Sequence, residues 1–177
     1  MLNRRATVSP LFRRGVALAV LVVLVDQASK WWIFQHVMMP PRVIEVTPFF
    51  NLVMTWNRGV SFGLFNTDSP YNALILSAVA FSICALLLIW LARADRPALA
   101  YGLGAVIGGA LGNLVDRLRF GAVADFLDFH VWGYHWPAFN VADSAITVGM
   151  AVLIAESFFG APDERRKDKE FGREHGK

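Results

Sequence analysis

The chain has 177 residues, of which 55% are hydrophobic and 18% are charged, and its mean hydropathy is +0.44. Soluble domains usually carry about 25% charged residues, so this composition excludes an ordinary soluble globule, and the length excludes more than one membrane domain. The net charge is +3, but no basic face interleaved with aromatic residues is present, which excludes a nucleic-acid-binding protein. We therefore expect an all-α membrane protein.

Four segments are apolar enough to cross a bilayer, which takes about 20 residues. We expect these spans at about 15–34, 71–91, 97–115 and 141–159. The first segment also resembles a secretory signal, since arginines precede its apolar run. Cleavage is the alternative interpretation, but Asp26 and Lys30 stand where small residues should mark the cleavage site. The single cysteine, Cys84, is interpreted as a small packing or lipid-facing residue.

Lys and Arg residues are unevenly distributed around the four spans. Twelve flank the N-terminus, the link between the second and third spans, and the tail, whereas five fall on the other side. This asymmetry predicts that both termini are cytoplasmic. Residues 1–162 would then form a single membrane domain, and the charged tail 163–177 would be disordered. Most polar residues of interest gather at the outer end of the spans, which predicts a site near the outer membrane surface.

The end of the first span carries two opposite charges. Asp26 and Lys30 are four residues apart and therefore share a helix face. We interpret Lys30 as part of a structural ion pair, with its ammonium reaching out to the membrane interface. Asp26 is interpreted as a residue that supports a nearby site.

Residues 43–65 have the pattern of a strand rather than a helix. Apolar residues alternate with others over 50–57, which is the period of a β-strand. Asn57-Arg58-Gly59 is typical of a turn. Two interpretations stand: a simple outer loop, or a small β element that cradles a substrate.

The third span combines a glycine pattern with a polar end. Glycines spaced four apart allow another helix to approach closely; they are Gly104, Gly108 and Gly112. Asn113, Asp116 and Arg117 follow on one helical face, and contacts to other spans are expected rather than an Asp116–Arg117 pair. They are interpreted as a polar clamp beside the site, with a plain helix-end cluster as the alternative.

Asp125 and Asp143 are the leading candidates for chemistry. Carboxylates at a membrane boundary are costly to maintain, and two that converge can act as an acid/base pair. If 123–129 is a strand, Asp125 and Asp128 point to opposite faces, and Asp128 is interpreted as a solvated loop carboxylate. Asn140 and Asp143 also have the spacing of a capping box, which is compatible with catalysis or explains both residues without it.

Metal or cofactor chemistry is not expected. The four histidines, at 36, 130, 135 and 175, do not have the spacing of a zinc site. Neither a nucleophile elbow nor a recognisable Ser-His arrangement is present.

Five stretches in this order resemble bacterial lipoprotein signal peptidases, also called signal peptidase II. They are DQASK (26–30), NRGVSFG (57–63), GGALGNLVDR (108–117), VADF (123–126) and FNVADS (139–144). The resemblance covers about 15–160, with no departure at the key polar positions.

The resemblance implies an inner-membrane aspartic endopeptidase with four transmembrane helices and an extracytoplasmic β cradle at about 43–65. Its substrates would be prolipoproteins, cut before a diacylglyceryl-modified cysteine, and it would be a target of globomycin. Asp125 and Asp143 would be the catalytic dyad. The residues that would bind substrate or support the dyad are Asp26, Lys30, Asn57, Gly59, Asn113, Asp116, Arg117 and Asn140. We expect a monomer in contact with membrane lipids.

A small transporter or channel is the main alternative, because it would also place Asp, Asn and Arg inside helices. It would distribute polar residues across the membrane depth. A non-catalytic lipid-binding or assembly subunit is the second alternative, and it would tolerate Asp→Asn changes at 125 and 143.

Overall fold

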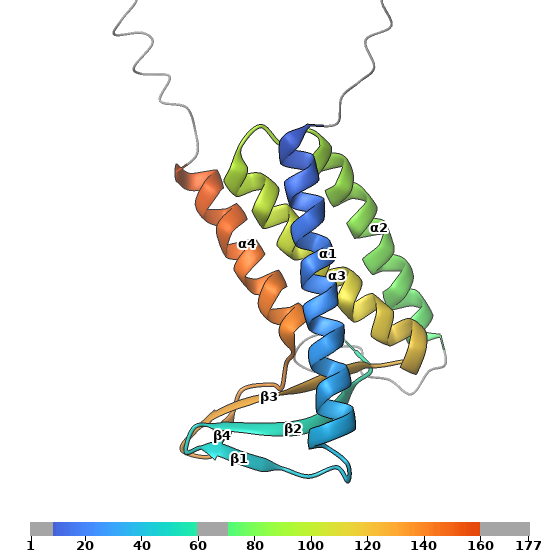
Figure 1. Ribbon diagram of the computed structural model, residues 1–177, viewed down its shortest axis with the longest axis vertical. Coiled ribbons are helices and arrows are strands. Elements are labelled where there is room, and N and C mark those ends of the chain that lie inside the picture. Colours follow the sequence, from blue (N-terminus) through green and yellow to red (C-terminus); the bar gives the residue numbers. More distant parts are fainter. Residues whose placement is uncertain (1–8, 60–70, 160–177) are drawn as a thin grey trace, which may run out of the picture.

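A computed structural model describes residues 9–59 and 71–159, which form a bundle of long helices with a small sheet at one end (Figure 1). The long helices are α1 (Pro10–Trp32), α2 (Asn72–Ala92), α3 (Pro97–Phe120) and α4 (Val141–Phe159). Each of these four is long and apolar enough to cross a membrane. The expected fold class is confirmed. Residues 60–65 of the expected cradle and the tail 163–177 lie outside the described residues.

The helix ends follow from local sequence. The Ser9 side chain caps α1 by accepting the Leu11 N–H at 3.3 Å, and Pro10 takes the first helical position. Two helices run beyond the expected spans: α1 begins at Pro10 rather than at 15, and α3 continues to Phe120. Helix α3 stops at Gly121, whose φ of +73° is a left-handed conformation that glycine adopts without strain. A short π-helix, η1 (Ile33–Val37), extends α1 toward the sheet.

Helix α3 is the centre of the bundle and packs against the other three helices. Its glycines make this possible, as the spacing predicted. A Cβ on Gly108 would approach the backbone oxygen of Ala19 in α1 to 2.6 Å. A Cβ on Gly109 would collide with the backbone oxygen of Ala142 in α4. Both neighbouring helices therefore lie directly against the α3 backbone.

The sheet has the strand order β1-β2-β3-β4, with antiparallel neighbours, and lies at the end of the bundle where α1 and α3 finish and α4 begins (Figure 1). Its strands are β1 (Ile44–Thr47), β2 (Phe50–Asn57), β3 (Val123–Val131) and β4 (Tyr134–His135). Over the described residues, the 43–65 segment is therefore a β element and not a simple loop. It pairs with β3, the strand that carries Asp125, because Thr55 and Asp125 are cross-strand partners.

Candidate active site

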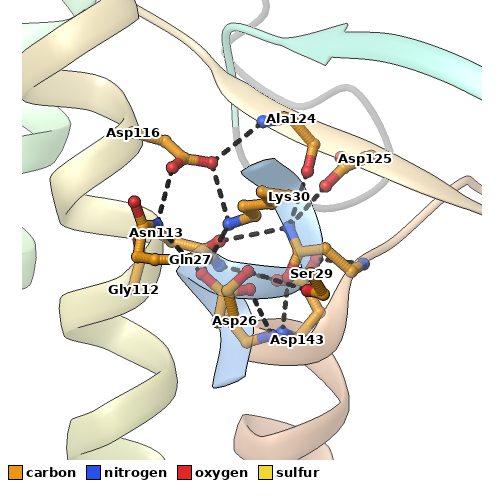
Figure 2. A network of polar contacts seen from close by, with 12 residues as sticks. Asp26, Gln27, Ser29, Lys30, Gly112, Asn113, Asp116, Ala124, Asp125 and Asp143 are labelled. Carbon is orange, nitrogen blue, oxygen red and sulfur yellow. Dashed lines mark hydrogen bonds and ion pairs between the residues drawn. The ribbon is translucent and has the colours of Figure 1, made fainter. Parts of the chain in front are cut away.

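A buried charge cluster forms the base of the site. The Lys30 ammonium lies 2.8 Å from Asp26 Oδ2 and 2.8 Å from Asp116 Oδ2, and Lys30 is only 3% exposed. The expected ion pair is present, but the expectation that Lys30 reaches out to the interface is wrong: its ammonium points inward (Figure 2). Burying an ammonium costs desolvation free energy, and here the attraction of two carboxylates offsets that cost.

This cluster also holds the two segments that carry the candidate dyad. Asp26 Oδ1 accepts the N–H of Ala142, the residue before Asp143, at 2.9 Å. Asp116 Oδ2 accepts the N–H of Ala124, the residue before Asp125, at 3.2 Å. Two carboxylates from α1 and α3 thus fix the backbone next to both aspartates.

Asn140 connects the two aspartates directly. Its Nδ2 donates to Asp125 Oδ1 at 2.7 Å and to the Ala124 carbonyl at 3.2 Å, while its Oδ1 accepts the Asp143 N–H at 2.9 Å. Asp143 Oδ2 in turn accepts the Asn140 N–H at 3.3 Å. The expected capping box is therefore present, and the same asparagine that starts α4 also binds Asp125. Capping and a role in the site are combined in one side chain.

Each aspartate has a second amide donor from another segment. Asn113 Nδ2 of α3 donates to Asp143 Oδ1 at 2.8 Å, and Asn57 Nδ2 of β2 donates to Asp125 Oδ2 at 3.2 Å. The two carboxyl groups are thus each held by two donors at the junction of α3, α4 and the sheet. Burial, followed by the negative charge of Asp143, raises the pKa of the Asp125 carboxyl to about 7. A carboxyl that keeps its proton near neutral pH can donate that proton to a reacting group.

The Asn57-Arg58-Gly59 segment is the expected turn, and it contacts the clamp. The Gly59 N–H donates to Asn57 Oδ1 at 3.0 Å, and Arg117 Nη2 donates to the Gly59 carbonyl at 2.9 Å. Among the residues that the structure describes, Arg117 Nε is buried without a hydrogen-bond partner. Asn113 and Asp116 thus contact the spans α4 and α1, as predicted, whereas Arg117 contacts the β2 turn.

Asp128 is not a solvated loop carboxylate, and that expectation is wrong. It lies in β3, is 6% exposed, accepts Asn51 Nδ2 at 3.1 Å and lies 2.9 Å from His135 Nδ1. The reason is that Asp128 pairs with Asn51 of β2 and that the His135 side chain of β4 lies against its carboxylate. As expected from strand alternation, Asp128 does not take part in the hydrogen bonds around Asp125 and Asp143.

Two contacts were not anticipated from the sequence. Gln27 Nε2 donates to Asp116 Oδ1 at 2.9 Å and to the Gly112 carbonyl at 3.2 Å, which ties α1 to α3. The only sequence feature that could have indicated this role of Gln27 is its position next to Asp26. At the other end of the bundle, Glu156 of α4 forms an ion pair with Arg96 at 3.0 Å. Within the two described stretches, no three His, Cys, Asp or Glu side chains are grouped so that they could hold a metal ion.

These features define a polytopic membrane protein with a buried polar site at one end of its helices. The profile of the family described as Signal peptidase (SPase) II matches residues 18–159. The chain therefore belongs to the signal peptidase II family and is a membrane peptidase.

Relatives and solved structures agree with this assignment. The chain is 45% identical over 155 residues to a lipoprotein signal peptidase of Nitrobacter hamburgensis, covering 85% of this chain and 94% of the relative. It is 41% identical over 167 residues to a lipoprotein signal peptidase of Desulforapulum autotrophicum, covering 92% and 99%. A bacterial membrane enzyme solved by the in meso method at 2.3 Å resolution matches with a TM-score of 0.71 and 26% identity, over 85% of this chain and 93% of that one.

Proposed function

We propose that this protein is an aspartic endopeptidase that removes signal peptides from prolipoproteins, cutting before a diacylglyceryl-modified cysteine. The substrate class follows from membership of a family whose curated members are lipoprotein signal peptidases. The observation that carries the aspartic mechanism is the Asn140 bridge, which donates to Asp125 at 2.7 Å and accepts from the Asp143 backbone at 2.9 Å. It holds two carboxyl groups from different elements at one site.

The proposed reaction needs one ionised and one protonated aspartate. Two neighbouring carboxylates resist ionising together and share a proton. Asp143 lies in the first turn of α4, where the positive end of the helix dipole favours a carboxylate. Asp143 would take a proton from water, which attacks the scissile carbonyl, while protonated Asp125 donates to the carbonyl oxygen and then to the leaving amine. The pKa of Asp125, raised to about 7, supports its role as the acid.

The supporting residues have distinct proposed roles. Asn57, Asn113 and Asn140 orient the dyad through the amide donors described above. Arg117 and Gly59 hold the β2 turn beside it. The carboxylates of Asp26 and Asp116, both paired with Lys30, fix the backbone on both sides.

We further propose a monomer in the bacterial inner membrane with both termini in the cytoplasm. The support is the distribution of Lys and Arg, with twelve on the side of the termini and five on the side of the sheet. The sheet and the dyad would then lie at the outer surface, where the lipid chains of a substrate can remain in the bilayer. Cysteine-scanning with a membrane-impermeant thiol reagent tests this: a cysteine at Trp132, in the β3–β4 turn, should be labelled in spheroplasts without lysis.

The test of the activity is a gel-shift cleavage assay on purified protein in detergent. The substrate is a prolipoprotein with or without the diacylglyceryl group on its cysteine. We expect wild type to cleave only the lipidated form. We expect Asp125→Asn and Asp143→Asn to cleave neither form. Asp128→Asn is the matched control and should cleave, since Asp128 contacts Asn51 and His135 rather than the dyad. Cleavage that survives Asp125→Asn or Asp143→Asn would refute the aspartic mechanism. Absence of cleavage by folded wild-type protein would favour a transporter or a binding subunit.

A further inference from the structure

A groove lies on the side of the site formed by α1, the end of α3 and strand β2. Its volume is about 510 Å³, within the range of about 300–1,000 Å³ typical of small-molecule sites. Its lining residues come from the ends of α1 and α3 and from β2, and Figure 1 shows the sheet at this end of the bundle. The surface here is rich in exposed aromatic residues such as Trp31, Trp32 and Trp56. Such residues are enriched where a protein meets the membrane–water interface.

The walls of the groove are apolar and built from three elements. Phe34 of η1 stacks on Trp56 of β2 with ring centroids 5.5 Å apart, and Trp56 contacts Phe120 of α3 at 5.4 Å. Methionines 38, 39 and 54 line the rest of the apolar surface. Methionine side chains adapt to irregular apolar partners, and an acyl chain is such a partner.

One cation stands at this groove without a countercharge. Arg119 lines it, is exposed, and lies over the Phe120 ring with its guanidinium carbon 5.0 Å from the centroid. Within residues 9–59 and 71–159, no carboxylate forms an ion pair with Arg119. The other cation at the groove, Lys30, is already neutralised by Asp26 and Asp116. Arg119 is therefore available for a phosphate, which its planar guanidinium binds well.

We propose that the groove binds a membrane phospholipid with an anionic headgroup, with the phosphate on Arg119 and an acyl chain against the Phe34–Trp56–Phe120 wall. Apolar walls, an unpaired cation and a position at the membrane boundary together select this ligand over a soluble anion or a peptide. The inference does not depend on the proposed peptidase mechanism.

The lipid would also cover part of the charge cluster. Gln27, Lys30 and Asp116 line the groove, and Asp116 accepts the N–H of Ala124 beside Asp125. The protein already shields this ion pair from water, since Lys30 is 3% and Asp116 1% exposed. The lipid would therefore lie over the cluster without being needed to form it.

Native mass spectrometry of the full chain in detergent tests the proposal. The probes are phosphatidylglycerol and phosphatidylcholine with identical acyl chains. We expect about tenfold tighter retention of phosphatidylglycerol, because phosphatidylcholine carries the same phosphate beside a choline cation that Arg119 repels. Arg119→Gln should remove that preference and Arg119→Lys should keep most of it. Arg93→Gln is the matched control, an exposed arginine at the far end of the bundle, and should behave as wild type.

A second variant locates the acyl chain. Met54→Trp fills the groove and should reduce retention of both lipids, whereas Met150→Trp, on the exposed face of α4, should not. Unchanged binding in Arg119→Gln or Met54→Trp, or an equal loss in Arg93→Gln, would overturn the proposal. So would equimolar displacement of phosphatidylglycerol by a diacylglyceryl-cysteine peptide, because the groove would then belong to the substrate lipid. Binding is measured without cleavage, so this result is independent of the aspartic mechanism.

Discussion

The Asn140 side chain has two functions in this site. It begins α4 as a helix cap and it also orients Asp125 from the neighbouring strand. It is fully buried, so both functions depend on contacts that water cannot replace. Substitutions that keep one function and remove the other can separate stability from activity.

We expect Asn140→Ala to lose both functions. The lost cap should destabilise the protein by about 1 kcal/mol, and the lost hydrogen bond to Asp125 should lower kcat/KM about 100-fold, the usual scale for one positioned catalytic hydrogen bond. Asn140→Ser keeps a capping oxygen, but its side chain is too short to reach Asp125. It should therefore recover the melting temperature and remain poorly active in the prolipoprotein cleavage assay. Equal recovery of both quantities would mean that Asn140 acts only as a cap.

The protonation of Asp125 predicts a pH dependence of stability. Its pKa in the folded protein, about 7, lies above the ordinary value of 3.8 because of burial and then the charge on Asp143. Between these values the folded protein retains a proton that the unfolded chain releases. The associated stabilisation is fully present below about pH 3.8 and is lost as the pH rises through about 7.

The measurement is the melting temperature of wild type and of Asp125→Asn, which cannot titrate, at a series of pH values. We expect wild type to lose stability relative to the variant as the pH rises over the interval between those two pKa values. Asp95→Asn, which changes an exposed carboxyl near the α2–α3 link, controls for general charge effects. A difference that does not change with pH would indicate that Asp125 is ionised throughout.

At the scale of elements, the close packing of α3 against α4 sets where Asp143 stands relative to α3. Gly109 faces the Ala142 carbonyl at the start of α4, and Asn113 one turn later donates to Asp143. The contact at Gly109 involves backbone, which cannot move aside as a flexible side chain can. The helix pair therefore has little tolerance for an added methyl group.

Gly109→Ala should accordingly push α4 away from α3. We expect a loss of about 1–3 kcal/mol in the free energy of unfolding, typical of an overpacked contact, together with reduced cleavage because the Asn113–Asp143 hydrogen bond lengthens. Leu118→Ala, on the exposed face of the same helix, is the matched control and should change little. Thermal unfolding in detergent and the cleavage assay measure the two effects. A variant as stable and active as wild type would show that the helices can separate without cost.

At the scale of the whole molecule, the Asp26–Lys30–Asp116 cluster joins all the parts that form the site. It links α1 to α3, and its carboxylates also bind the backbone of α4 and β3 (Figure 2). Removal of the single cation would leave two buried carboxylates close together. The resulting loss of stability should therefore affect the packing of α1, α3, α4 and β3 together.

Lys30→Met is expected to be strongly destabilising, by about 3–5 kcal/mol, since breaking a buried ion pair leaves uncompensated charge. The expected observation is a large fall in melting temperature and in the yield of monodisperse protein. The control is Arg14→Met, which removes an exposed cation from the same helix. Adding Asp26→Asn and Asp116→Asn to Lys30→Met should restore part of the stability, and no restoration would argue against charge as the cause.

Features that depend on neighbouring residues could be predicted from the amino-acid sequence. The four spans follow from hydropathy, β2 from its alternation over Phe50–Asn57, and the α4 cap from the spacing of Asn140 and Asp143. These are set within one or two turns or one strand, where periodicity and capping chemistry act directly.

The directions and partners of the polar side chains depend on how the elements pack and could not be predicted from the sequence. Lys30 points inward because Asp116 of α3 lies beside it, and Asp128 is buried because Asn51 of β2 and His135 of β4 lie against it. The contact of Asn140 with Asp125 likewise joins residues from a helix cap and a strand. Such pairings depend on which surfaces meet where the glycines of α3 let the helices approach closely. Local sequence patterns do not specify which surfaces these are.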